Sequence, residues 1–344
     1  MAYTTINKSS DYFNTKLYTG NFTDNTDITG VGFQPDLVWL KERSSGSSNL
    51  LQDAVRGANK DLFSDTSSAE ESNTNRMKAF ISDGFTLGAH NLSNQNGETY
   101  ASWNWKANGA GSANTAGSIS STVSANTTAG FSIVTFTGNE TVDSTVGHGL
   151  GAIPKMIIVK GTSFSAPWIV YHHSIGNSNY LRLNTTDAEA TANGMWSNTT
   201  PTNSVFTLGT DSWGNNNGQS LIAYCFAEKQ GYSKFGSYKG NGNANGAFVY
   251  TGFSPAFFML KRTDGTNSWR MWDNKRDPFN VRDTSINANE NDAEYTDASV
   301  YMDFVSNGVK FRTTGDNVSG GNYIYMAFAE APLVGTNGVT AKAR

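Results

Sequence analysis

The chain reads Pro154-Lys-Met-Ile-Ile-Val-Lys160 near its middle: a proline, a short apolar run, and a lysine six residues after the proline. The same pattern stands at Pro35-Asp-Leu-Val-Trp-Leu-Lys41 and at Pro255-Ala-Phe-Phe-Met-Leu-Lys261. A Gly-Asn pair precedes each proline by 15 or 16 residues, and its glycines are Gly20, Gly138 and Gly240. Three occurrences of one spaced pattern predict a tandem array of three diverged copies.

The copies are as long as whole domains. Gly20 and Gly138 are 118 residues apart, and Gly138 and Gly240 are 102 residues apart. Solenoid repeats and propeller blades have periods of roughly 20–50 residues, whereas single domains commonly hold roughly 100–150. The similarity continues beyond the lysine: Trp168 and Trp269 each follow it by eight residues, with Asn49 at the matching place in the first copy. Each copy is therefore expected to fold as a small domain with its own core.

Strand signals dominate within each copy. The apolar runs after the prolines are typical of central strands buried on both faces, and alternating segments elsewhere are typical of half-buried strands. A proline is tolerated at the first residue of a strand, which makes Pro35, Pro154 and Pro255 predicted strand starts. The Gly-Asn pairs predict turns in which Gly or Asn takes a positive φ. The expected fold is all-β, with three tandem β-sandwich (jelly-roll-like) domains.

The amino-acid composition indicates where the linker and the terminal segments lie. Residues 108–129 hold almost only Gly, Ala, Ser, Thr and Asn, which predicts a flexible linker. Aromatic residues between the second and third copies indicate that these two dock closely. The predicted divisions are an N-terminal arm at 1–16, sandwich repeats at 17–107, 130–235 and 236–332, and a C-terminal tail at 333–344.

Charge and composition exclude several classes of partner. Charged residues make up only 16% and the net charge is −4, so the chain lacks the basic footprint of a nucleic-acid-binding protein. No apolar run approaches the ~20 residues of a membrane-spanning helix, so no membrane partner is expected. The polar N-terminus lacks the apolar region of a signal peptide. The single cysteine, Cys225, is expected to be a small buried apolar side chain.

The titratable residues form no recognisable reactive pattern. A zinc site needs three or four ligands, and the spacing of the histidines does not match such a site. The four histidines are His90, His148, His172 and His173. Acidic clusters at 65–71 and 290–297 are interpreted as solvated loops rather than a paired-carboxylate site. Calcium at 24–27 or 287–292 is a weaker alternative, because the EF-hand spacing is absent. The sequence thus predicts no metal, no cofactor and no enzyme.

Two tryptophans are the candidates for ligand binding. Trp39, Trp103, Trp105, Trp168 and Trp269 lie in the repeated strands, where core packing is expected. Trp196 and Trp213 lie instead in Asn/Gly/Thr-rich loops of the second copy, without a counterpart in the others. Because aromatic faces can stack on sugar rings, partly exposed tryptophans there would suit a glycan.

Several stretches of the second and third copies carry a family resemblance. Trp272-Asp-Asn-Lys-Arg276-Asp-Pro-Phe279 and Tyr323-Ile-Tyr-Met-Ala-Phe-Ala-Glu-Ala-Pro332 resemble a C-terminal module of virion proteins of marine tailed bacteriophages. Gly147-His-Gly-Leu-Gly151 resembles the upstream module of that family, so the likeness covers about residues 130–344. The first copy fits more loosely, with Trp103-Asn-Trp105 where the family has Phe-Ala-Glu.

The resemblance implies a bacteriophage virion structural protein, made in the cytoplasm of the bacterial host and located in the tail or another particle appendage. It implies a tail or tail-fibre component that contributes to assembly and host-surface attachment. A capsid decoration or head-fibre protein is the alternative, and a carbohydrate-binding or polysaccharide-degrading protein is the second alternative. The implied partners are other virion proteins, further copies of the chain in a symmetric trimer or hexamer, and a host-surface glycan.

Overall fold

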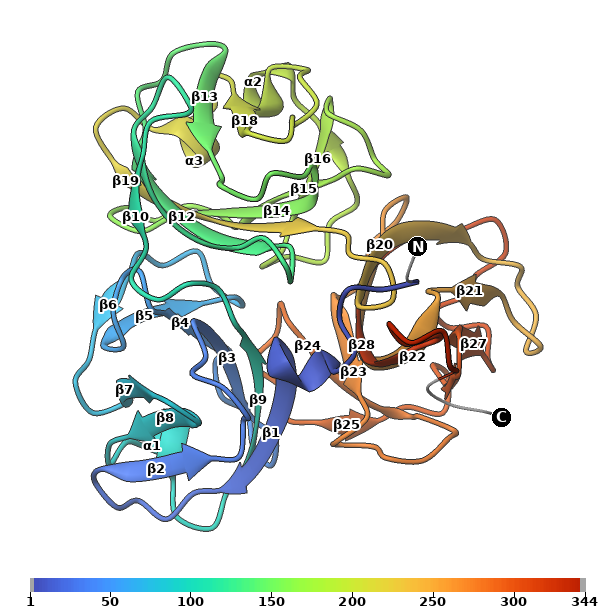
Figure 1. Cartoon of the computed structure of the whole chain (residues 1–344). Helices are drawn as coiled ribbons and strands as arrows, with labels where there is room; N and C mark the ends of the chain where they lie inside the picture. The colour runs from blue at the N-terminus through green and yellow to red at the C-terminus, as the bar shows by residue number, and fades with distance from the viewer. Residues whose placement is uncertain (1–2, 341–344) are drawn as a thin grey trace.

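The computed structural model describes residues 3–340 and consists of three lobes around a common centre (Figure 1). Each lobe holds one of the three copies: repeat 1 spans residues 13–105, repeat 2 spans 112–227 and repeat 3 spans 233–332. Strands make up 43% of the chain and helices 4%, which confirms the all-β prediction. The described parts of both termini lie beside repeat 3.

Every repeat is a sandwich of one large and one small antiparallel sheet, in the strand orders β1-β9-β3-β4-β5-β6 with β2-β8-β7, β10-β11-β12-β19-β14-β15-β16-β17 with β13-β18, and β20-β28-β22-β23-β24-β25 with β21-β27-β26. Repeat 1 and the segment before it contain η1 (Ser9–Asp11), β1 (Phe13–Thr19), β2 (Thr26–Thr29), β3 (Leu37–Glu42), β4 (Leu50–Asp53), β5 (Lys60–Phe63), β6 (Glu71–Ser72), β7 (Met77–Ile81), β8 (Gly84–Leu87), α1 (Asn91–Asn94) and β9 (Thr99–Trp105). Repeat 2 contains β10 (Ser112–Asn114), β11 (Ser121–Asn126), β12 (Phe131–Thr137), β13 (Ser144–Gly147), β14 (Pro154–Gly161), β15 (Ile169–His172), β16 (Asn179–Arg182), β17 (Ala190–Thr191), α2 (Asn193–Trp196), β18 (Val205–Leu208), α3 (Ser212–Asn215) and β19 (Ser220–Ala227). Repeat 3 contains β20 (Ser233–Lys239), β21 (Phe248–Tyr250), β22 (Phe253–Arg262), β23 (Arg270–Asp273), β24 (Thr284–Asn287), β25 (Tyr295–Thr296), β26 (Met302–Val305), β27 (Gly308–Phe311) and β28 (Asn322–Pro332).

The apolar runs after the prolines serve two cores at once. Successive side chains of a strand point to opposite faces of its sheet. In β14, Ile157 and Val159 pack toward the small sheet of repeat 2, whereas Met156 and Ile158 point to the other face. The runs in β3 and β22 alternate in the same way, and all three are buried along their whole length. The prediction of strands buried on both faces is confirmed.

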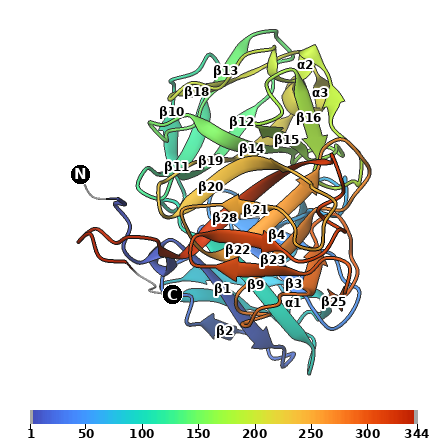
Figure 2. The same ribbon diagram turned by 90° about the vertical axis from the view of Figure 1, so that its right-hand side faces the viewer.

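The outer faces of the three large sheets meet in one shared core. This core joins Trp39 and Trp105 of repeat 1, Ile158 and Phe226 of repeat 2, and Phe328 of repeat 3. Its rings are close, with 5.7 Å between the ring centroids of Trp105 and Phe328. A cavity of ≈ 10 Å³ is found within it, which is too small for a ligand. The expectation of three separate cores therefore missed a fourth, and the lobes form one packed body (Figure 2).

The predicted flexible linker at 108–129 is wrong. Strands β10 and β11 lie in it and extend the large sheet of repeat 2 beside β12. In β11, Val123 contributes to the core of repeat 2 and Ser124 is buried, so small and hydroxylated residues serve here as sheet residues. The low hydrophobicity of the segment reflects a strand with few large side chains, not the absence of structure.

The N-terminal arm is also shorter than predicted, because β1 begins at Phe13. The residues before β1 fold back onto the same chain: Ile6 enters the shared core and the Tyr3 hydroxyl donates to the Gly252 carbonyl oxygen at 2.8 Å. Asn7 bonds Thr336, so the two ends of the chain contact each other. The last part of the predicted tail, residues 341–344, lies outside the described residues.

The three prolines differ in how they enter their strands. Pro154 is the first residue of β14, as predicted. Pro35 precedes β3 by two residues, and Pro255 is the third residue of β22 rather than its first. Pro255 sits at a register shift between β22 and β28, where a bulge tolerates its missing N–H.

The repeated glycines are needed for close packing, not for a positive φ. A Cβ on Gly138 would stand 2.4 Å from the Asn216 carbonyl oxygen, and Gly20 and Gly240 face equally close carbonyls. The positive φ falls two residues later, on Glu140 in repeat 2. The backbone N–H of the intervening Asn139 donates to the Asn215 side chain at 2.9 Å. The turn prediction thus placed the positive φ on the wrong residue.

Candidate functional site in the grooves between the repeats

The three lysines that end the apolar runs link the lobes in a cycle. Lys41 of repeat 1 donates to the Asn291 carbonyl oxygen of repeat 3 at 2.9 Å. In the same way, Lys160 reaches Ser67 of repeat 1 and Lys261 reaches Thr186 of repeat 2. Burial lowers the pKa of each of these lysines to about 8. The lysines of repeats 2 and 3 thus each contact the preceding repeat, and the lysine of repeat 1 contacts repeat 3. The three head-to-tail contacts form a closed ring.

The side chains eight residues after the lysines repeat this cycle. The Trp168 indole donates to the Phe63 carbonyl oxygen of repeat 1 at 2.8 Å, and the Trp269 indole donates to the Arg182 carbonyl oxygen of repeat 2 at 2.9 Å. At the matching place in repeat 1, the Asn49 amide lies 2.7 Å from the Glu290 carbonyl oxygen of repeat 3. The matching positions seen in the sequence are therefore interface positions.

A glutamate marks the outer part of each interface. The backbone N–H groups of Glu70, Glu189 and Glu294 donate at 2.8 Å to carbonyl oxygens of a neighbouring repeat, which belong to Thr162, Thr263 and Arg43. The backbone thus places three carboxylates equivalently, one in each interface. Two of them, Glu70 and Glu294, belong to the acidic clusters at 65–71 and 290–297, so the interpretation of those clusters as solvated loops is wrong for these two residues.

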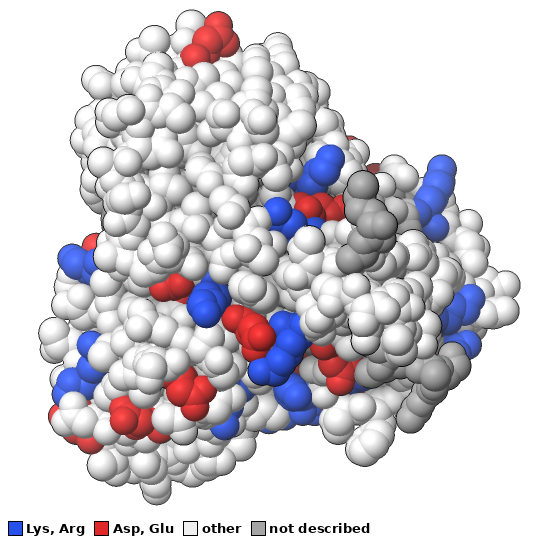
Figure 3. Space-filling view, viewed as in Figure 1, with Lys and Arg blue, Asp and Glu red and all other residues white. Residues whose placement is uncertain are grey.

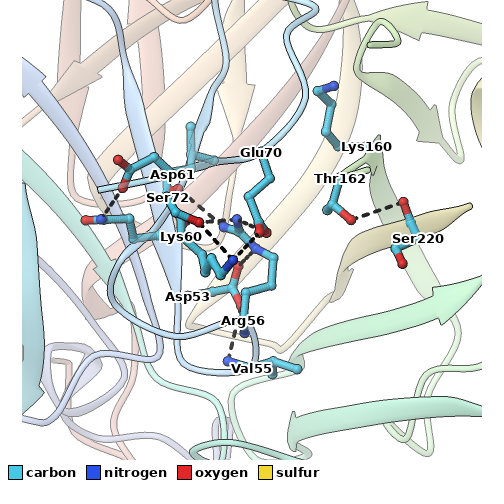
Figure 4. A network of polar contacts seen from close by, with 12 residues as sticks. Asp53, Val55, Arg56, Lys60, Asp61, Glu70, Ser72, Lys160, Thr162 and Ser220 are labelled. Carbon is cyan, nitrogen blue, oxygen red and sulfur yellow. Dashed lines mark hydrogen bonds and ion pairs between the residues drawn. The ribbon is translucent and has the colours of Figure 1, made fainter. Parts of the chain in front are cut away.

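The interface of repeats 1 and 2 holds an open groove of ≈ 610 Å³. On one side Arg56 contacts Asp53 at 2.6 Å and Glu70 at 3.2 Å (Figure 4). Thr162 and Ser220 lie across the groove in the same view. Further hydroxyls line it from β11 and β12, so the groove combines a small ion-pair network with a wall of Ser and Thr.

The interface of repeats 3 and 1 contains the same carboxylate with two guanidinium partners. Arg276 contacts Glu294 at 3.0 Å and also pairs with Asp273. Arg43, the residue after β3, contacts both Glu294 oxygens, at 2.9 and 2.7 Å. The Trp103 indole of repeat 1 donates to Asp273 at 3.1 Å, which adds a further link between the lobes.

The interface of repeats 2 and 3 contains a groove of ≈ 460 Å³ and lacks these arginines. His172 stands where the other repeats have Asp53 and Asp273, three residues before the position that Arg56 or Arg276 occupies. Burial lowers the pKa of His172 to about 3, so its ring is neutral. Its Nε2 lies 3.3 Å from the Tyr325 carbonyl oxygen of repeat 3.

The structure separates the two tryptophans proposed for ligand binding. Trp196 is only 1% exposed and packs on Tyr171, so the expected exposed face is wrong. Trp213 is half-buried in α3, with its ring 6.0 Å from the Arg182 guanidinium and 6.5 Å from the Tyr180 ring. Neither lies among the residues that line the two grooves.

Charged side chains gather along the seams between the lobes, and the face of repeat 2 seen in Figure 3 is nearly free of them. Among residues 3–340, no three His, Cys, Asp or Glu side chains lie close enough together to hold a metal ion. Within the same range, no helix has the length and apolar character needed to cross a bilayer.

A family described as Domain of unknown function (DUF7483) matches residues 8–332. The chain belongs to this family. The match runs from the segment before β1 to the end of β28, so the family comprises all three repeats as one unit. No curated protein and no solved structure matches the chain.

Proposed function

We propose that this chain is a structural protein of a bacteriophage particle, a tail or tail-fibre component that contributes to assembly and host-surface attachment. The carrying observation is the cyclic closure of the three repeats around one core. The residues that recur in all copies, including the lysines and Gly-Asn pairs, hold the scaffold together. This use of the repeat, together with the likeness of residues 130–344 to phage virion proteins, supports a structural role.

The internal ring also bears on the expected oligomer. One chain already carries three similar lobes in a head-to-tail arrangement, which a fibre usually gains by trimerisation. Such a chain suits attachment at the end or side of a threefold appendage. The trimer or hexamer of whole chains stays part of the proposal, and light scattering of the purified protein at 37.1 kDa per chain distinguishes these states.

Electron microscopy with a labelled antibody tests the location. Particles of the phage that encodes this chain are expected to carry label on the tail. Label on capsid faces or vertices would favour the decoration or head-fibre alternative. Purified particles without the chain, judged by mass spectrometry, would contradict every form of a virion role.

The groove between repeats 1 and 2 supports glycan binding as the second candidate function. Its walls carry the hydroxyls of Thr122, Thr137, Thr162 and Ser220 beside a compensated ion pair. Such a surface can donate and accept many hydrogen bonds, which suits the hydroxyls of a sugar. Its volume of ≈ 610 Å³ falls in the range of small-ligand sites.

A glycan array compares the wild-type chain with two groove variants and one variant of the tryptophan hypothesis. Thr122→Val and Thr137→Val each remove a hydroxyl from the groove while keeping the side-chain shape. Loss of binding in these variants, with binding kept in Trp213→Ala, places the sugar in the groove. The reverse pattern places it at α3, and no binding by the wild-type chain would reject this candidate.

A further inference from the structure

The third of the equivalent carboxylates, Glu189, lacks the partner that the other two have. Its backbone is held as theirs are, by a 2.8 Å hydrogen bond across the interface to Thr263. Its side-chain oxygen Oε2 is buried, and within residues 3–340 no hydrogen-bond or ion-pair donor contacts it. The residue as a whole is half-buried, so the carboxylate also borders the groove. An ionised carboxylate with one oxygen buried and unpaired is costly, so a cationic donor supplied by another molecule would stabilise it.

The sequence of repeat 2 explains why the partner is missing. Arg56 and Arg276 stand three residues after an aspartate at the end of β4 or β23, and Ile175 takes this place in repeat 2. The second guanidinium of the filled site comes from Arg43, and Thr263 takes that place. Both routes by which a guanidinium reaches the carboxylate are therefore closed in the interface of repeats 2 and 3.

The space that the arginines would fill is an open groove of ≈ 460 Å³. Its walls include Ile175, Glu189, Tyr238, Thr263 and Tyr323. Burial, with a smaller contribution from the nearby Asp264 charge, raises the pKa of Glu189 above its usual range. A cation entering the groove would stabilise the ionised form of Glu189. Its charge would offset the cost of burying the carboxylate and the repulsion from Asp264, and its N–H groups would supply the missing donors.

We propose that the groove between repeats 2 and 3 binds the guanidinium group of an arginine side chain of a partner protein, with Glu189 as the receiving carboxylate. The internal comparison favours guanidinium over ammonium. Both filled sites use arginine, and Arg43 contacts its carboxylate through two nitrogens, which a lysine cannot do. The apolar stem of the entering side chain would lie against Ile175 and the ring of Tyr323, which line the groove.

One cation already lines the groove and gives the proposal a further check. Lys239 is exposed, and the ion pairs of the described residues do not include one between Lys239 and Glu189. Its charge would repel an entering guanidinium, so Lys239→Gln is expected to strengthen binding. A weakening would mean that Lys239 itself holds the ligand and would contradict the assignment of Glu189 as the group that receives it.

Titration calorimetry of the whole chain with Nα-acetyl-L-arginine amide tests the proposal. The neutral isostere Nα-acetyl-L-citrulline amide and the ammonium probe Nα-acetyl-L-lysine amide are the comparison ligands. Binding of the arginine probe is expected to be about tenfold tighter than that of either comparison ligand, since it alone offers a charged fork of donors. Equal binding of citrulline would overturn the proposal, and equal binding of lysine would overturn the guanidinium assignment.

Three variants locate the binding. Glu189→Gln is expected to weaken the arginine probe about tenfold, whereas Glu140→Gln, on the exposed Gly-Asn turn, leaves it unchanged. Ile175→Arg restores the internal partner, so it should raise the melting temperature and abolish probe binding. Probe binding that survives both Glu189→Gln and Ile175→Arg would place the ligand elsewhere and overturn the proposal.

Discussion

The indole nitrogen of Trp168 in repeat 2 donates a hydrogen bond to the carbonyl oxygen of Phe63 in repeat 1, 2.8 Å away. Phe63 is the last residue of β5, and Arg182, which receives the equivalent bond from Trp269, is the last residue of β16. The same donor position thus meets the same acceptor position in two interfaces. The same contact therefore joins neighbouring lobes in both interfaces, so the interfaces belong to the fold together with the three sandwiches.

Replacing Trp168 by Phe tests the weight of this contact. The change removes the indole donor, leaves the Phe63 carbonyl oxygen with only the longer 3.3 Å bond from the Thr66 N–H, and opens a small space in the shared core. The free energy of unfolding is expected to fall by about 2–4 kcal/mol, measured by urea denaturation. Trp213→Phe, at the half-buried ring of α3, is the control and should cost under ~1 kcal/mol. Equal effects of the two changes would contradict the interface role.

The pair of Arg276 and Asp273 offers a second test, because both side chains are 0% exposed. Burial alone would raise the pKa of Asp273, but the charge and hydrogen bonds of Arg276 outweigh it and hold that pKa below its usual range. Arg276→Met leaves a buried charge unpaired and should lower the unfolding free energy by about 3–5 kcal/mol. Adding Asp273→Asn should recover a large part of this loss, and simple additivity of the two losses would argue against the coupling.

Gly138 tests the corrected explanation of the repeated glycines. Gly138→Ala would press its Cβ against the Asn216 carbonyl oxygen at 2.4 Å, so backbone must move and about 2–4 kcal/mol of stability should be lost. Gly218→Ala is the matched control, because Gly218 has φ +70° but an open surrounding, and about 1 kcal/mol is expected there. A larger loss at Gly218, read by thermal denaturation, would favour the positive-φ explanation.

The buried lysines predict a pH dependence. Their pKa of about 8 in the folded chain lies below the ~10.4 of an unfolded lysine, so between these values the unfolded state binds more protons. The contribution of these lysines to the free energy of unfolding therefore rises with pH between about 8 and ~10.4 and does not change with pH below about 8. Buried tyrosines and Cys225, whose pKa values burial raises, oppose the rise at high pH, so the comparison must be made against a variant.

Lys261→Met supplies that comparison. The unfolding free energy of the wild-type chain, relative to Lys261→Met, should increase by about 2 kcal/mol between pH 8 and pH 10. Guanidinium denaturation at matched ionic strength measures it, and the contributions of the tyrosines and Cys225 cancel in the difference. A difference that stays constant over this range would show that Lys261 keeps an ordinary pKa in the folded chain.

The strand pattern could be predicted from the sequence, but the shared core could not. The run in β14 indicated burial on both faces. The identities of Met156 and Ile158, however, do not show which part of the protein covers the second face. The needed signal was present in the alignment of Asn49 with Trp168 and Trp269. Polar and aromatic donors at one position are unusual for a simple core, and all three proved to bond a neighbouring lobe.

The groove carboxylates were missed for a related reason. Glu70 and Glu294 lie in acidic stretches that resemble solvated loops. A sequence does not show that Arg56 will pair with Glu70 within repeat 1, or that Arg43 will reach Glu294 across an interface. The segment at 108–129 was misjudged because Ser, Thr and Ala are common to linkers and to weakly apolar strands such as β11. Sheet pairing with β12, a tertiary feature, decides between them.

The central claim is that three copies form a single body around a shared core, and differential scanning calorimetry tests it most directly. The chain is expected to unfold in one transition, with the calorimetric enthalpy equal to the van't Hoff enthalpy. Lobes that fold independently would instead give a calorimetric enthalpy about three times the van't Hoff value, or resolved transitions. That second result would contradict the account of the cyclic interfaces and of the grooves they create.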